Sequence, residues 1–161
     1  MNVAAAARRR REQAAARYRP ARIHTLLVAE APPSALDRHF YFEDVTIHDS
    51  LFRHVVEAVL GDKPSRDKAA YLDELRERGW FLIHMSEEPF RDFAVLPPLL
   101  PDLLARCHEL APRRIVLIGA RLFDLVHRPM RDAGLPVVDV RLPYPGSGQQ
   151  RRFLDGMRLV V

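Results

Sequence analysis

Four short apolar runs, separated by stretches with helical periodicity, limit the folds open to this chain more than any other feature of its sequence. Each run suits a buried strand, and strands are expected near residues 23–29, 80–85, 114–118 and 136–141. Helices are expected over residues 49–60, 66–78, 97–110 and 120–133. Because parallel strands require crossover connections, this alternation predicts an α/β fold, a three-layer αβα sandwich with a central four-stranded parallel sheet.

The clearest helical pattern lies in residues 49–60. Apolar side chains occupy positions 51, 52, 55, 56, 59 and 60. Asp49 or Ser50 is suited to cap the amino end, since either side chain can accept a hydrogen bond from a free backbone N–H. Gly61 is suited to end the helix, because glycine readily adopts the left-handed conformation found at helix C-termini.

The composition is typical of one globular domain, with 161 residues of which 48% are hydrophobic and 29% are charged. The single cysteine, Cys107, excludes an intramolecular disulfide and any metal or iron–sulfur site made wholly of cysteines. No apolar run approaches the roughly 20 residues needed to span a bilayer, and no segment has the layout of a signal peptide. We therefore expect a cytoplasmic protein with no membrane partner, and the functional hypothesis favoured below is that of a monomer.

The net charge of +4 is concentrated at the amino end of the chain. Residues 1–22 hold seven arginines against one acid, Glu12, whereas the remainder holds 18 basic and 20 acidic residues. The same stretch consists almost wholly of good helix formers. We expect residues 1–21 to form a basic helical or flexible arm ahead of a domain that spans residues 22–161.

Three interpretations of the arm are open. Its arginines could neutralise the phosphates of a nucleic acid, in which case deleting residues 1–20 should weaken DNA binding and leave the melting temperature nearly unchanged. The arm could equally be a solvated helix with no partner. An arginine-rich, acid-poor start is also found in transit peptides.

Ligands of open parallel sheets bind beyond the carboxyl ends of the strands, so the loops after the expected strands form the candidate site. The first strand is followed by Ala29-Glu30-Ala31-Pro32-Pro33 and then by Phe40-Tyr41-Phe42. The second ends in His84-Met85-Ser86. After the last expected strand comes a loop with prolines and glycines, from Arg141 to Arg152.

In these loops and in its order of elements, the chain resembles the uracil-DNA glycosylase superfamily over residues 22–155. One branch of that family has Gly-Glu-Ala-Pro-Gly where this chain has Ala29-Glu30-Ala31-Pro32-Pro33. The family's third strand resembles Pro-x-x-Ile-Val-x-Leu-Gly, which residues 112–119 match well. Tyr144-Pro145-Gly146-Ser147 stands where the family has His-Pro-Ser or Asn-Pro-Ser.

The resemblance implies roles for residues in these loops. Phe40 or Phe42 would stack on an extruded base, and His84 would contact the edge of that base. Both phenylalanines could instead be core residues, and His84 could be a structural histidine. The remaining candidate substrate contacts are Ala31, Pro145, Gly146 and Ser147.

A glycosylase extrudes a base from the duplex and cleaves its N-glycosidic bond. Positive charge develops on the sugar and negative charge on the base, so a carboxylate near C1′ and a donor near the base oxygen both lower the barrier. Glu30 is the only ionisable residue of the first loop, and Tyr144 can donate a hydrogen bond from the last one. They are the candidate catalytic residues, although Glu30 could instead be a surface or capping acid.

Arg151 and Arg152 follow a loop whose small residues would let backbone N–H groups approach an anion. They are the candidate DNA contacts, although the loop could equally be a plain turn. DNA is the expected partner of the chain.

The chain departs from the family at several positions. Ala29 and Pro33 replace the glycines of the first motif, and no histidine stands in the last. The branch with the similar first motif usually holds an iron–sulfur cluster on four cysteines, which are absent here. The histidines show no metal-ligand spacing, so we expect neither a metal nor another cofactor.

The expected function is hydrolysis of the N-glycosidic bond of a deaminated base in DNA, as in base excision repair. Two alternatives stay open. One is a catalytically silent nucleic-acid-binding protein of the same fold. The other is a small-molecule enzyme that processes nucleotides or nucleosides.

Overall fold

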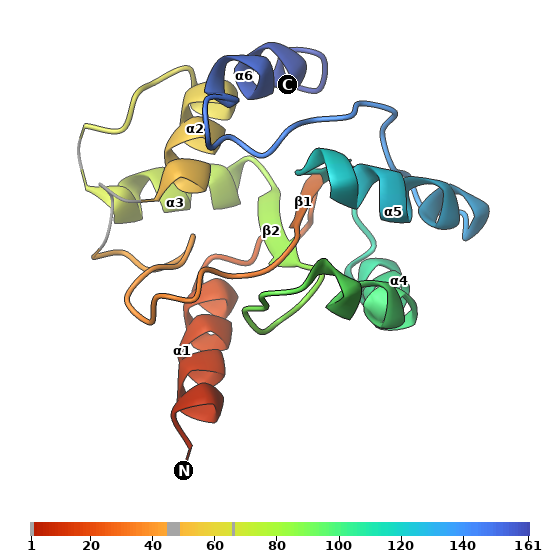
Figure 1. Ribbon diagram of the computed structural model, residues 1–161. Helices are drawn as coiled ribbons and strands as arrows, with labels where there is room; N and C mark the ends of the chain where they lie inside the picture. The colour runs from red at the N-terminus through yellow and green to blue at the C-terminus, as the bar shows by residue number, and fades with distance from the viewer. Residues whose placement is uncertain (1, 45–48, 66) are drawn as a thin grey trace.

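The computed structural model describes residues 2–44, 49–65 and 67–161. The chain has an α/β fold in which β1 (Thr25–Ala29), β2 (Trp80–His84) and β3 (Arg114–Leu117) form a parallel sheet in the order β2-β1-β3 (Figure 1). Thr25 pairs with both Trp80 and Arg114, so the strands begin together at one edge of the sheet. The central strand is buried along its whole length, which explains its unbroken apolar sequence.

The prediction of a fourth strand at residues 136–141 is wrong. This segment runs beside β3 and meets it at two isolated bridges, Ile115 with Val137 and Ile118 with Leu142. Between these bridges the segment advances five residues while β3 advances three. The two extra residues interrupt the ladder of paired residues, so within the described residues the sheet has three strands.

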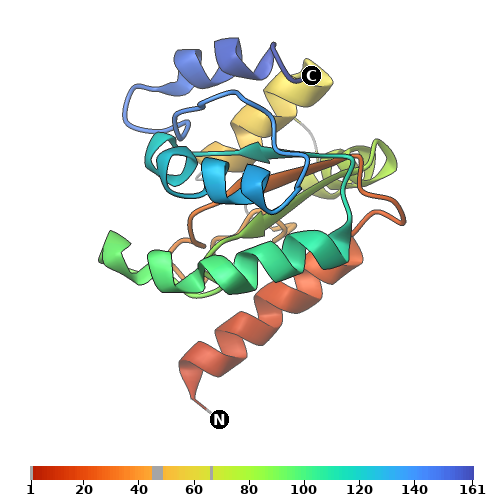
Figure 2. The same ribbon diagram turned by 90° about the vertical axis from the view of Figure 1, so that its right-hand side faces the viewer.

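Helices lie on both sides of the sheet. Figure 2 shows α1 and α4 together below it, and α2 and α6 together above it. The described residues form α1 (Val3–Arg17), α2 (Ser50–Leu60), α3 (Lys68–Glu77), α4 (Leu100–Leu110), α5 (Ala120–Asp132) and α6 (Gln150–Met157), with 3₁₀ turns at Phe93–Val95 and Pro97–Leu99. All of these helices are too short or too polar to span a membrane.

The caps predicted for α2 are confirmed. Asp49 accepts a hydrogen bond from the Phe52 N–H at 3.0 Å, and Gly61 ends the helix at a φ of 71°. The other expected helices occur in their places, although residue 66 of the expected 66–78 helix lies outside the described residues. Helix α6 was not predicted, since its 8 residues are too few for a clear apolar period.

Helix α1 packs against the domain. Tyr18, directly after it, is buried in the core and stacks on Tyr41 with ring centroids 6.0 Å apart. Arg11 is 9% exposed and donates a hydrogen bond to the carbonyl of Glu87 at 2.8 Å. The arm is therefore a docked helix, not a solvated one.

Candidate functional site

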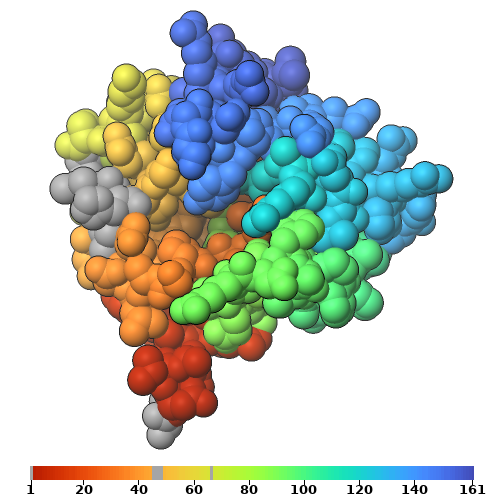
Figure 3. Space-filling view, viewed as in Figure 1, coloured from red at the N-terminus to blue at the C-terminus, as the bar shows by residue number. Residues whose placement is uncertain are grey.

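A cleft of about 1120 Å³ lies beyond the carboxyl ends of β1 and β3. Its walls come from the loop after β1, from the start of α5 and from the loop before α6, and Figure 3 shows the surface hollowed between these segments. This is the edge of the sheet where the sequence predicted a site.

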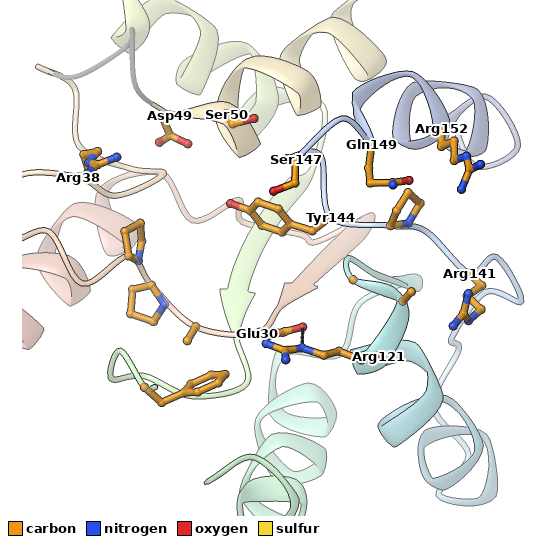
Figure 4. Close-up of a pocket in the computed structure, with 18 residues that line it drawn as sticks. Glu30, Arg38, Asp49, Ser50, Arg121, Arg141, Tyr144, Ser147, Gln149 and Arg152 are labelled. Carbon is orange, nitrogen blue, oxygen red and sulfur yellow. Dashed lines mark hydrogen bonds and ion pairs between the residues drawn. The ribbon is translucent and has the colours of Figure 1, made fainter. Parts of the chain in front are cut away.

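An ion pair between Glu30 and Arg121 lies in this cleft (Figure 4). The Arg121 Nε and Nη2 atoms donate to the two Glu30 carboxylate oxygens at 2.9 and 2.7 Å. The Arg121 guanidinium also lies over the Phe93 ring, 4.5 Å from its centroid. Glu30 is 19% exposed at its side chain, so a well-fixed negative charge faces the cleft beside its counter-ion.

Sequence reasoning missed Arg121. Its position could have indicated a place in the cleft, because Arg121 follows β3 by a few residues and β3 ends at the same sheet edge as β1. Nothing in the local sequence pairs it with Glu30, which is 91 residues away.

Gly119 joins β3 to α5 beside the Glu30 carboxylate. Its φ is 119°, which side-chain-bearing residues rarely adopt, and a Cβ at this position would lie 3.3 Å from Glu30 Oε2. Glycine is therefore favoured here by conformation, and any Cβ would also crowd the Glu30 carboxylate.

Gly119→Ala is expected to lower the free energy of unfolding by about 1–3 kcal/mol and to displace the Glu30 carboxylate. Urea denaturation of the variant would measure the loss. Gly134→Ala is the matched control, because Gly134 also has a positive φ, 79°, but meets nothing within 4 Å. An equal loss in both variants would mean that the contact with Glu30 contributes nothing.

Tyr144 faces Glu30 from the opposite wall of the cleft. Its ring rests on Gly146, where a Cβ would lie 3.3 Å from the ring. Figure 4 shows its hydroxyl pointing into the cleft toward the side formed by Arg38 and Asp49. Partial burial, helped by the charges of Asp49 and Glu30, raises the pKa of Tyr144 to about 12, so the hydroxyl stays protonated and can donate at neutral pH.

The cleft also contains the predicted site residues Ala31, Gly146, Ser147 and Arg152. Pro145 is buried beside them, and its carbonyl accepts a hydrogen bond from the hydroxyl of Ser50 at the start of α2. That bond fixes the last loop to the body of the protein. Arg151 is exposed on α6 and does not line the cleft.

The predicted base contacts Phe40, Phe42 and His84 lie away from the cleft. Phe40 is buried in the core with its ring centroid 5.6 Å from that of Phe52. Phe42 is buried beneath the Arg10 guanidinium, which lies 4.0 Å from its ring centroid. Besides Tyr144, the cleft is lined by the aromatic residue Phe90, in the loop after β2, which the sequence analysis missed.

His84 lines a separate cavity of about 110 Å³ under α1. Its ring lies 5.5 Å from the ring of His39, and burial is the main reason that the pKa of each histidine falls to about 3. Both rings are therefore neutral at any ordinary pH.

These lowered pKa values predict acid sensitivity. Between pH 6.5 and 3 the unfolded chain protonates both histidines while the folded chain does not, so stability falls as the pH falls. We expect a loss of about 2 kcal/mol per histidine between pH 7 and pH 5. Urea denaturation of His84→Gln at the two pH values should show a smaller loss than the wild type. His108→Gln, at an exposed site, should show the wild-type loss, and equal losses in all three proteins would contradict the prediction.

Three arginines surround the mouth of the cleft. Arg141 is held by Asp124 in a two-bond ion pair at 2.9 and 2.8 Å. Arg38 and Arg152 are exposed, and among the described residues neither makes an ion pair. These two guanidinium groups are available to an anionic ligand.

In comparisons with known proteins, no family model matches the chain, and no curated protein or solved structure is significantly similar to it. Within the described part of the chain, no three His, Cys, Asp or Glu side chains lie close enough together to hold a metal ion. The evidence for a function therefore lies in the side chains of the cleft.

Proposed function

We propose that the chain is a divergent uracil-DNA glycosylase-like protein, a three-layer αβα sandwich that acts as a cytoplasmic monomer in base excision repair. The position of Glu30 carries this proposal. A carboxylate follows the central strand of a parallel sheet, is fixed by Arg121, and faces a cleft whose opposite wall presents the Tyr144 hydroxyl.

In the proposed reaction, water attacks C1′ of the deoxyribose and the bond from C1′ to the base nitrogen breaks. The bond electrons leave with the base, the attacking water loses a proton to solvent, and the base takes up a proton from solvent. The charge of Glu30 would stabilise the positive sugar in the transition state, and the Tyr144 O–H would donate to the base as it becomes negative. Phe90 offers an apolar face for the extruded base, in place of the buried Phe40 and Phe42.

The phosphates that flank the target nucleotide would bind at the mouth of the cleft. Arg38 and Arg152 stand there without carboxylate partners among the described residues. The charge of these two arginines supports DNA as the ligand. The support comes from this local charge and not from a basic surface over the whole molecule.

One observation favours the silent nucleic-acid-binding alternative. Both oxygens of Glu30 already accept bonds from Arg121, so the carboxylate is partly neutralised before a substrate binds. The nucleotide-processing alternative is favoured by the cleft volume of about 1120 Å³, which is close to the range of small-molecule sites.

Single-turnover cleavage of duplex oligonucleotides that carry uracil, hypoxanthine or xanthine tests the proposal. We expect an abasic, alkali-labile product from at least one of them and none from the unmodified duplex. Binding without cleavage on all three would assign the silent function. Release of a base from free nucleosides alone would assign the small-molecule enzyme.

A further inference from the structure

Another cavity lies at the opposite edge of the sheet, where the strands begin. It has a volume of about 510 Å³ and is formed by residues 19–24, which precede β1, and residues 110–113, which precede β3. Backbone bonds hold the two segments side by side, since the Arg113 N–H donates to the Ile23 carbonyl at 3.1 Å and the Arg114 N–H donates to the His24 carbonyl at 3.0 Å. We call this cavity the amino-edge groove.

The lining of the amino-edge groove is basic. Arg19, Arg22 and Arg113 contribute guanidinium groups, and no carboxylate lines the cavity. All three arginines are exposed, and within the described residues none of them makes an ion pair. Three like charges around one cavity repel each other, and a bound anion would relieve that repulsion.

Four of the five arginines on α1 behave differently, because folding pairs them with acids. Arg8 and Arg11 bond Glu87 and Glu88, Arg10 lies 3.9 Å from Asp44, and Arg17 bonds Glu43 at 2.8 Å. Docking of α1 therefore neutralises much of the charge of the helix. Apart from Arg9, the excess that remains lies just after the helix, and Arg113 adds to it from a distant part of the chain.

The floor of the groove is apolar. Pro20 and Ile23 are buried, and Leu110 is half-buried beside them. Guanidinium groups above an apolar floor suit a ligand that combines phosphate with a base or a sugar, since the planar fork of arginine bonds phosphate oxygens in pairs.

We propose that the amino-edge groove binds the phosphate groups of nucleotides, either in a nucleic-acid strand or in a free nucleotide. The site is separate from the cleft that carries the proposed function. A strand of 5 residues is about 17 Å long, and the two cavities lie beyond its opposite ends. The proposal therefore holds or fails independently of glycosylase activity.

The test compares two triple variants of the full chain with the wild type. Arg19→Gln, Arg22→Gln and Arg113→Gln together remove the charge of the groove. Arg9→Gln, Arg128→Gln and Arg131→Gln together remove the same charge from exposed positions on α1 and α5. The probes are a fluorescein-labelled ten-nucleotide oligothymidylate, followed by anisotropy at several salt concentrations, and ATP, followed by calorimetry.

We expect the groove variant to bind the oligonucleotide about 10-fold more weakly at 50 mM salt, with the slope of log K against log salt reduced by about 2. The control variant should keep the wild-type slope. Loss of ATP binding alone would assign the groove to a free nucleotide, and loss of oligonucleotide binding would assign it to a strand. Equal effects in both variants, or wild-type binding of both probes by the groove variant, would overturn the proposal. So would a wild type that binds neither probe.

Discussion

Deletion of residues 1–20 is expected to lower the free energy of unfolding by about 5 kcal/mol or more, which is a large part of the stability of a domain of this size. The deletion removes Tyr18, which is 4% exposed and stacks on Tyr41, and loss of such a buried aromatic side chain alone costs about 3–5 kcal/mol. It also uncovers the cavity lined by His39 and His84. Urea denaturation followed by circular dichroism at pH 7 would measure the loss.

This loss of stability would contradict the expectation from the sequence that deleting residues 1–20 leaves the melting temperature nearly unchanged. That expectation rests on the charge of the arm and takes no account of its contacts with the core. Tyr18→Ala in the full chain should reproduce most of the loss. Tyr18→Phe is the matched control, because it keeps the ring and removes only the hydrogen bond from the hydroxyl to Glu43. A truncated protein that unfolds at the wild-type urea concentration would show that α1 is not needed for stability.

The three strands could be predicted because each is buried and its apolar run is unbroken. Leu26 and Leu27 are 0% and 1% exposed in β1, and Ile115 is 0% exposed in β3. The apolar residues at 137, 138 and 140 signalled partial burial equally well. A buried segment need not form a continuous hydrogen-bonded ladder with its neighbour, however. Here the two extra residues between the bridges to β3 interrupt the ladder, and their presence depends on the path of the chain after α5.

The location of the site could also be predicted, because parallel strands bring the loops after β1 and β3 to one edge. Glu30 and Tyr144 follow from that rule, together with the small residues of the last loop. Arg121 and Phe90 lie in the same cleft and were missed, since neither belongs to a recognisable motif. Their roles depend on contacts between distant segments.

The aromatic residues show the limit of the motif argument. Phe40 and Phe42 stand at the expected distance after the first loop, yet both rings are buried with Tyr41 next to the residues of α1 and α2. The charge pattern predicts an arm separate from the domain, whereas in the structure this arm covers the region. Without its contacts, the sequence offered no reason to place these rings in the core rather than in the cleft.

Glu30→Gln is expected to slow single-turnover cleavage by the proposed glycosylase about 10²–10³-fold. The substitution keeps the size of the side chain and removes the negative charge that faces the developing cation. Binding of the damaged duplex should change little, since the proposed phosphate contacts, Arg38 and Arg152, are untouched. Folding should be preserved as well, because Arg121 is 60% exposed and water can solvate its guanidinium once the charge of its partner is gone.

Asp102→Asn is the control for this variant. Asp102 is another carboxylate bonded by an arginine, here Arg106 at 2.9 Å, and neither residue lines the cleft, so its loss should leave the cleavage rate unchanged. Arg121→Gln separates charge from position, because Glu30 then keeps its charge and loses the groups that hold it in place. We expect an intermediate loss of about 10-fold, in the rate of cleavage rather than in binding.

A Glu30→Gln variant that cleaves at the wild-type rate would assign the catalytic charge to another carboxylate. Asp49, which lines the same cleft at the start of α2, is then the next residue to test.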